Sequence, residues 1–277
     1  MKRRLIQLCA ALLYNLNLKG FAEASIYKGK SKGLCVPGLN CYSCPGAVGS
    51  CPLGTLQNAL SAMDRKFPFY ILGVLLLFGV TMGRTICGFL CPFGLVQELL
   101  YRIPVPKIKK NRVTQELSKV KYVILAVFVI ILPVVFKAAS GLPVPAFCKY
   151  ICPAGTLEGG IPLVLLDDSL SGLAGALFHW KVLVLAVILV SACFLYRSFC
   201  RILCPLGAIY SLFAPVALLG VRIDRDTCVD CGRCVRTCKM DVRQVGDREC
   251  IQCGECMKEC NVDAIYWKKP WDVKSKK

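Results

Sequence analysis

One short unit recurs along this chain: two cysteines stand four positions apart, and the second is followed by Pro-x-Gly. It occurs as Cys87-Gly-Phe-Leu-Cys91-Pro-Phe-Gly94 and as Cys200-Arg-Ile-Leu-Cys204-Pro-Leu-Gly207, each after an apolar run. Two copies supply four thiolates, which is the number of ligands that a cubane iron–sulfur cluster needs. We therefore predict a 4Fe-4S cluster between two membrane helices, with four ligands: Cys87, Cys91, Cys200 and Cys204.

The second half of this unit occurs twice more, as Cys51-Pro-Leu-Gly54 and Cys152-Pro-Ala-Gly155. We predict a second cluster here, and six cysteines compete for its four places: Cys35, Cys41, Cys44, Cys51, Cys148 and Cys152. The repeat supports Cys51, Cys148 and Cys152. The fourth ligand is expected to be Cys41 or Cys44 rather than Cys35, and the extra thiols are unpaired, bridged or part of a different kind of cluster.

Proline after the ligand cysteine has a structural meaning in all four copies. Proline is favoured at the first position of a helix, where its missing N–H costs nothing, so the cysteine before it is expected to cap a new helix. A cluster with four thiolates is negatively charged, and the free N–H groups of a helix start stabilise negative charge. Two other cysteines, Cys9 and Cys193, have no partner at ligand spacing and are expected to be buried apolar side chains.

The C-terminal part contains two runs with the spacing C-x2-C-x2-C-x3-C, which is the pattern of bacterial two-cluster ferredoxins. In that pattern the fourth cysteine of each run ligates the other cluster. We assign one cluster to Cys228, Cys231, Cys234 and Cys260 and the other to Cys238, Cys250, Cys253 and Cys256. Zinc is the alternative for paired C-x2-C motifs, but two four-cysteine runs favour iron–sulfur clusters.

Composition indicates a membrane protein, because 56% of the 277 residues are hydrophobic and the mean hydropathy is +0.56. Besides a first helix at 5–18, three apolar runs cover 67–83, 122–136 and 182–196. The predicted fold is an all-α polytopic membrane protein of about four spans, pseudo-symmetric, with a C-terminal α+β two-cluster bacterial-ferredoxin-like domain. Buried helices of a soluble protein are the alternative. The expected parts are an N-terminal helix and Cys-rich module (1–66), membrane helices (67–220), a ferredoxin domain (221–267) and a basic tail (268–277).

The net charge of +18 is concentrated between the apolar runs and at the ends of the chain. Residues 102–121 carry seven Lys and Arg against one Glu, so the positive-inside rule places them in the cytoplasm. We predict a multi-pass protein of the prokaryotic cytoplasmic membrane with its ferredoxin domain in the cytoplasm. Nothing in the sequence resembles a groove-reading helix, so no nucleic-acid partner is expected.

With these motifs, the chain resembles membrane-bound polyferredoxins of the NapH and NosR type and their 4Fe-4S binding relatives. The resemblance rests on CGFLCPFG, CRILCPLG, CVDCGRC and CIQCGEC. It implies electron transfer. From the arrangement of the motifs we predict a component of an oxidoreductase system that relays electrons between the cytoplasmic domain and the opposite membrane face. Expected partners are lipid, a redox protein on each side (a ferredoxin or flavodoxin in the cytoplasm) and quinone. No catalytic residue is predicted; the alternatives are quinol oxidation near His179 or Asp167, and a redox sensor or metal-centre maturation factor.

Overall fold

Two long apolar helical stretches run through the computed structural model, which describes residues 2–61, 68–108, 110–166, 172 and 175–268. The first covers Arg112–Ser140, with 29 residues, and the second covers Ala176–Phe194, with 19 residues. Each is long and apolar enough to cross a membrane. Only 17% of the most apolar window of each stretch is buried, so their apolar side chains face outward.

The prediction of about four spans with a C-terminal α+β domain is wrong, because only these two described helices reach the length of a span. The first helix, α1, covers Lys2–Tyr14, and the helix of the run 67–83, α4, covers Phe69–Thr81. Helix α1 stops where Asn15 hydrogen-bonds back to the carbonyl of Ala11. Helix α4 is followed by Gly83, whose φ of +49° turns the backbone out of the helix. The described C-terminal residues form only short helices and a two-stranded sheet.

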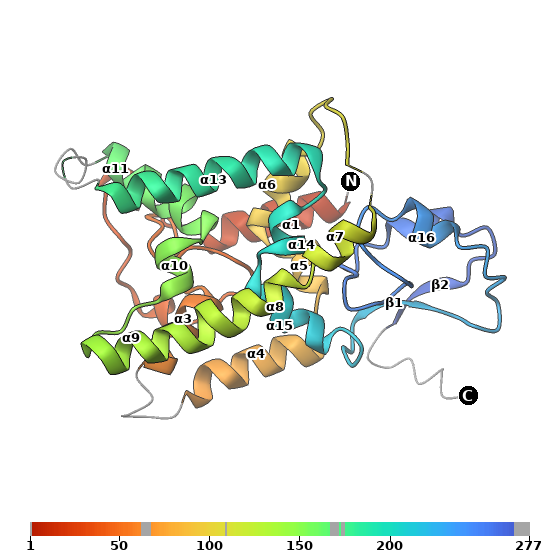
Figure 1. Ribbon diagram of the computed structural model, residues 1–277, viewed down its shortest axis with the longest axis horizontal. Coiled ribbons are helices and arrows are strands. Elements are labelled where there is room, and N and C mark those ends of the chain that lie inside the picture. The colour runs from red at the N-terminus through yellow and green to blue at the C-terminus, as the bar shows by residue number, and fades with distance from the viewer. Residues whose placement is uncertain (1, 62–67, 109, 167–171, 173–174, 269–277) are drawn as a thin grey trace.

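The remaining helices are short, and Figure 1 shows them packed between and beside the long ones. Their bounds are α2 Lys19–Ala22, η1 Lys30–Gly33, α3 Pro52–Ser61, α5 Thr85–Phe89, α6 Pro92–Leu100, α10 Ala146–Tyr150, η3 Gly155–Gly160, α11 Ile161–Leu166, α14 Ser198–Ile202 and α15 Pro205–Phe213. The largest hydrophobic core lies among them and includes the side chains of Cys51, Cys91, Cys152, Cys200 and Cys204. The cysteines of the recurring unit are therefore core residues.

The first long stretch consists of α7 (Arg112–Leu117), α8 (Val120–Ile124), η2 (Leu125–Ile131) and α9 (Leu132–Ser140). Asn111 caps its start, since the side chain of Asn111 accepts a hydrogen bond from the amide of Thr114. The segment η2 has the wider turn of a π-helix directly before Pro133. Proline has no N–H for the helical ladder, so a widened turn there keeps the stretch continuous. The second long stretch is the single helix α13 (Ala176–Phe194).

Residues 220–268, which we call the C-terminal segment, lie at the end of the helices where α7 begins (Figure 1). Strand β1 (Gly220–Ile223) pairs antiparallel with β2 (Ile265–Lys268), so that Gly220 lies opposite Lys268. Two short helices, α16 (Arg233–Thr237) and η4 (Glu255–Glu259), complete the segment. So small a sheet buries little apolar surface, and the segment depends on contacts with its neighbours.

Buried ion pairs attach the C-terminal segment to the helices. Arg201 of α14 pairs with Asp241, and each side chain is only 1% exposed. Arg84 donates to the carboxylate of Glu249 at 3.0 Å, and Lys121 of α8 pairs with the same carboxylate. Buried pairs of this kind fix geometry, because breaking one leaves an uncompensated charge. The position of the C-terminal segment is therefore specified by charge as well as by packing.

Candidate cluster-binding sites

The first group of cysteines surrounds a small cavity in the core, which we call the inner site. Helices α5 and α6 position Cys87 and Cys91, and helices α14 and α15 position Cys200 and Cys204. All four side chains line the same cavity. The structure thus brings together the two copies of the unit that are more than a hundred residues apart, as the sequence predicts.

The helix starts follow from Cys-Pro as expected. Cys91 and Cys204 are N-caps with extended backbone, and the proline after each is the first residue of α6 and α15. The Sγ of Cys204 accepts a hydrogen bond from the amide of Gly207 at 3.3 Å. The Sγ of Cys152 accepts one from Gly155 at 3.4 Å in the same way. These sulfurs therefore sit among free backbone N–H groups, which stabilise a negatively charged cluster.

Two buried arginines beside the inner site were not predicted from the sequence. Arg197 lies next to Gly94. Burial lowers its pKa, but the charges of Tyr196 and Glu98, followed by those of the two nearest cysteines, raise the pKa above its usual value. Arg84 is 1% exposed, and its Nε and Nη2 have no hydrogen-bond partner among the described residues. The charge of Cys87 is among the causes that raise the pKa of Arg84 against the effect of burial. Two unpaired donor atoms on the buried guanidinium of Arg84, which lies within the electrostatic reach of Cys87, fit a bound group with net negative charge.

The second group surrounds a cavity of about 570 Å³, which we call the outer site. Four cysteines line it: Cys41, Cys51, Cys148 and Cys152. Gly155 lies between two of them, because a Cβ placed on Gly155 would be 3.7 Å from the Sγ of both Cys41 and Cys152. The sequence left the fourth member open, and the structure places Cys41 in that position.

The other two candidates for the fourth position of the outer site do not line its cavity. Cys44 is buried but does not line the cavity of the outer site, and Cys35 donates to the hydroxyl of Thr55 at 3.6 Å. The spacing of Cys41 and Cys51 differs from that of the C-x3-C pairs. For this reason the sequence alone could not separate Cys41 from Cys44.

Glu158 holds the backbone at Cys41, and sequence reasoning missed this role. Its carboxylate accepts a hydrogen bond from the amide of Cys41 at 2.7 Å. Burial raises the pKa of Glu158 to about 7, while this hydrogen bond acts in the opposite direction. Burial also raises the pKa of the Cys41 and Cys148 thiols to about 12 each. Ligation of a metal by these thiols must therefore release protons.

If the outer site holds a 4Fe-4S cluster, as the sequence predicts, serine in place of Cys41 is expected to remove that cluster, whereas serine in place of Cys44 is expected to leave it. The reason is position, since only Cys41 lines the cavity with the other three cysteines. Iron quantitation on the purified variants checks this, with a loss of about four iron atoms per chain for Cys41→Ser alone. The opposite pattern would assign the fourth position to Cys44.

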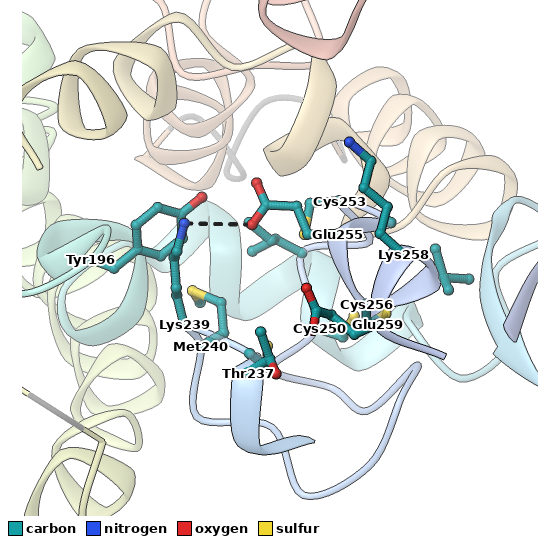
Figure 2. A pocket seen from close by; sticks show the side chains of 14 residues that line it. Tyr196, Thr237, Lys239, Met240, Cys250, Cys253, Glu255, Cys256, Lys258 and Glu259 are labelled. Atoms are coloured by element: carbon teal, nitrogen blue, oxygen red, sulfur yellow. Dashed lines mark ion pairs between the residues drawn. The ribbon is translucent and has the colours of Figure 1, made fainter. Parts of the chain in front are cut away.

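The second C-terminal group lines a cavity of about 340 Å³ between η4 and the helices, shown in Figure 2. Cys238, Cys250, Cys253 and Cys256 all line it, as the ferredoxin pattern predicts. Tyr196 forms the opposite wall. Lys239, which replaces the usual proline after Cys238, forms an exposed ion pair with Glu255 at 3.7 Å.

The other C-terminal group comprises Cys228, Cys231, Cys234 and Cys260. Cys231 is exposed, and the charges of Cys228 and Cys231 are among the causes that raise the pKa of Cys234, after burial. Cys260 directly follows η4. Arg233 of α16 donates a hydrogen bond to the side chain of the next residue, Asn261, at 2.7 Å, which connects α16 to the end of η4. This group is the more accessible of the two in the C-terminal segment.

The remaining candidates do not join these groups. Cys9 is exposed, so the prediction of burial is wrong for it, and Cys193 is half-buried with its Sγ donating to the carbonyl of Leu189 at 3.5 Å. His179 packs edge-on against Phe178 on the surface, and Asp167 and the tail 269–277 lie outside the described residues. In the described part of the chain, no three His, Cys, Asp or Glu side chains converge on one point as a single metal ion requires.

The helical part of this chain matches a known protein family. Residues 50–70, 67–111, 122–161 and 176–223 each match the family described as 4Fe-4S binding domain. Every matched segment contains one Cys-Pro-x-Gly unit, and together the segments cover more than half of the chain. The match ends before the C-terminal cysteine runs.

Several curated proteins are similar to the chain. They include the uncharacterized protein MJ0750 of Methanocaldococcus jannaschii (29% identity over 61% of this chain and 64% of the relative). The putative electron transport protein YccM of Escherichia coli is 23% identical over 70% of this chain and 54% of its own length. The methylamine utilization ferredoxin-type protein MauN of Paracoccus denitrificans is 26% identical over 70% and 62%.

The chain thus spans between about half and two thirds of the length of these relatives. No solved structure matches it. The narrower resemblance to the NapH and NosR type stays a prediction. The four matched segments carry all eight cysteines of the inner and outer sites except Cys41, and they show that the chain belongs to the 4Fe-4S binding domain family.

Proposed function

We propose that this protein is an iron–sulfur electron-transfer protein that relays electrons through four 4Fe-4S clusters, one at each group of four cysteines. The support is the family match, the electron-transport and ferredoxin-type names of its relatives, and the cysteine groups, three of which each line a common cavity. Bound clusters would supply one-electron chemistry, and the chain contributes their positions and their surroundings. At each transfer one electron leaves one cluster and enters the next, and no bond forms or breaks.

One observation carries the relay: the inner and outer sites share a wall. Leu39, which is 2% exposed, lines the cavity of both sites. Its neighbour Gly38 packs against Cys91, since a Cβ on Gly38 would lie 3.2 Å from the Cα of Cys91. Cys41 of the outer site follows two residues after Leu39 in the same segment. A single short loop therefore runs from one site to the other, and electron tunnelling requires such short steps.

The contact between the inner site and the C-terminal segment is equally close. Gly88, between Cys87 and Cys91, packs on the carbonyl of Ile251, where a Cβ would collide. Ile251 follows Cys250 directly. We therefore expect electrons to pass, in either direction, along four groups in order. The first is the more accessible C-terminal group with Cys231, and the second is the C-terminal group with Cys250, which we call the Tyr196-facing group. The inner site and then the outer site follow.

We propose further that the protein is a multi-pass protein of the prokaryotic cytoplasmic membrane, with Arg112–Ser140 and Ala176–Phe194 as spans. The basic residues before and at the start of α7 and the C-terminal segment lie at the same end, which the positive-inside rule assigns to the cytoplasm. Residues 221–267 then exchange electrons with a soluble carrier such as a ferredoxin or flavodoxin. The outer site serves a redox partner on the other face.

Electron transfer across lipid vesicles tests this function. The purified protein is reconstituted with ferricyanide trapped inside, and reduced flavodoxin is added outside. We expect ferricyanide reduction that depends on the protein, together with about sixteen iron atoms per chain. A preparation with full iron content but no transfer would contradict the relay. About eight iron atoms would contradict clusters at the inner and outer sites.

A further inference from the structure

Two glutamines occupy the same place in two copies of the recurring unit. Gln97 stands six positions after Cys91, and Gln57 stands six positions after Cys51. Both side chains are fully buried, with 0% exposure. A buried amide needs partners for its donor and acceptor atoms, so the partners of these two side chains are informative.

At the inner site, Gln97 of α6 reaches across to α14. Its Nε2 donates a hydrogen bond to the Sγ of Cys200 at 3.0 Å. Its Oε1 accepts one from the backbone amide of Phe199 at 3.0 Å, which is the residue directly before Cys200. The side chain of Gln97 thus hydrogen-bonds both to the sulfur of Cys200 and to the backbone directly before Cys200.

At the outer site, Gln57 of α3 makes the same two bonds. Its Nε2 donates to the Sγ of Cys148 at 3.3 Å, and its Oε1 accepts from the amide of Phe147 at 2.9 Å. Cys148, like Cys200, is the first cysteine of a C-x3-C pair. The same arrangement therefore occurs twice in one chain, at segments with different neighbours.

In the other two copies of the recurring unit, the position six residues after the Cys-Pro cysteine is not glutamine, and its side chain has a different role. Glu158 stands six positions after Cys152 and accepts from the amide of Cys41 at 2.7 Å. Tyr210 stands six positions after Cys204 and donates to the carbonyl of Pro37 at 2.9 Å. Both hold the loop that joins the two sites. Only the glutamines donate to a cysteine sulfur.

We propose that Gln57 and Gln97 are positioning residues that set the reduction potentials of the outer and inner clusters by hydrogen-bonding to one ligand sulfur each. The inference rests on the proposed cluster binding. An added electron makes a cluster more negative, so an N–H donor at a ligand sulfur stabilises the reduced form and raises the potential. The low polarity of these core sites strengthens that effect.

The test is a redox titration of the full-length protein, followed by EPR, with iron content measured on the same samples. Gln97→Leu is expected to lower the potential of the inner cluster and to leave the outer one unchanged, and Gln57→Leu is expected to do the reverse. Each variant is thus the control for the other. Gln97→Glu and Gln57→Glu keep an acceptor for the phenylalanine amide and, at alkaline pH, also lower the potential of their own cluster.

Iron content separates the two levels of the proposal. A wild-type protein without iron at these sites contradicts the proposed function itself. Full iron content with unchanged potentials in the leucine and glutamate variants overturns the role of the glutamines alone. Loss of the iron of one site from both its leucine and its glutamate variant assigns that glutamine a purely structural role and likewise overturns the proposal.

Discussion

Replacement of Cys200 by serine is expected to stop electron transfer between the C-terminal segment and the outer site. Cys200 is 6% exposed and lines the cavity of the inner site with three other cysteines. Without that thiolate the inner cluster loses a ligand. The remaining route would have to pass from the Tyr196-facing group to the outer site in a single long step.

Iron analysis and the vesicle assay check this expectation together. The Cys200→Ser protein is expected to lose about four of roughly sixteen iron atoms and nearly all transfer to trapped ferricyanide. Its C-terminal clusters are expected still to be reduced from outside. Cys193→Ser is the matched control, since Cys193 lies in α13, seven positions before Cys200 in the sequence, and lines none of the three cavities described above. Transfer at the wild-type rate in Cys200→Ser would exclude the inner site from the route.

Replacement of Glu98 by glutamine is expected to lower the free energy of unfolding by a large amount. Glu98 is 3% exposed, and its carboxylate accepts hydrogen bonds from Arg197 at 2.6 Å, Arg3 at 2.7 Å and the hydroxyl of Tyr196 at 2.8 Å. Loss of the carboxylate leaves the buried charge of Arg197 without its partner. Breaking a buried pair in this way costs about 3–5 kcal/mol.

Thermal unfolding of the purified protein in detergent measures this loss. The control is Glu116→Gln, because the Glu116–Lys119 pair is about two thirds exposed on both sides and exposed pairs contribute about 0–1 kcal/mol. We expect a large drop in melting temperature for Glu98→Gln and almost none for Glu116→Gln. Equal, small shifts would show that Arg197 finds other compensation.

The same carboxylate makes stability depend on pH. Burial acts to raise the pKa of Glu98, but Arg197 and Arg3 outweigh it and hold the pKa below the ordinary value of 4.5. A lowered pKa contributes stability that is present above about pH 4.5 and lost as pH falls through the folded-state pKa. The wild-type protein is therefore expected to lose stability in acid, and the Glu98→Gln variant is expected to lack that component.

The sequence predicted which cysteines lie around a common cavity far better than it predicted the helix lengths. Repeated spacing identified Cys87 with Cys91 and Cys200 with Cys204, and Cys-Pro predicted where α6 and α15 begin, because both signals are local. The number of spans was wrong because apolar composition does not show where a helix ends. In α4 the end depends on the backbone of Gly83, and in α1 it depends on Asn15.

The buried polar residues around the sites could not be predicted from local patterns. Arg84, Gln97 and Glu158 acquire their roles through partners far away in the sequence, such as Glu249, Cys200 and Cys41. Nothing in their own neighbourhood marks them as buried. The glutamines did leave a signal, however, since both stand six positions after a Cys-Pro cysteine.

The order of the cysteines along the chain has a consequence for biosynthesis. Cys41 and Cys51 of the outer site come first, Cys87 and Cys91 of the inner site second, Cys148 and Cys152 of the outer site third, and Cys200 and Cys204 of the inner site last. The two sites therefore interleave, and each closes a loop of about one hundred residues, which carries an entropic cost. A ribosome releases half of each site long before the other half exists. On the proposed assignment, a newly made chain must keep its early thiols reduced until residue 204 has emerged, and iron can enter the inner site only then.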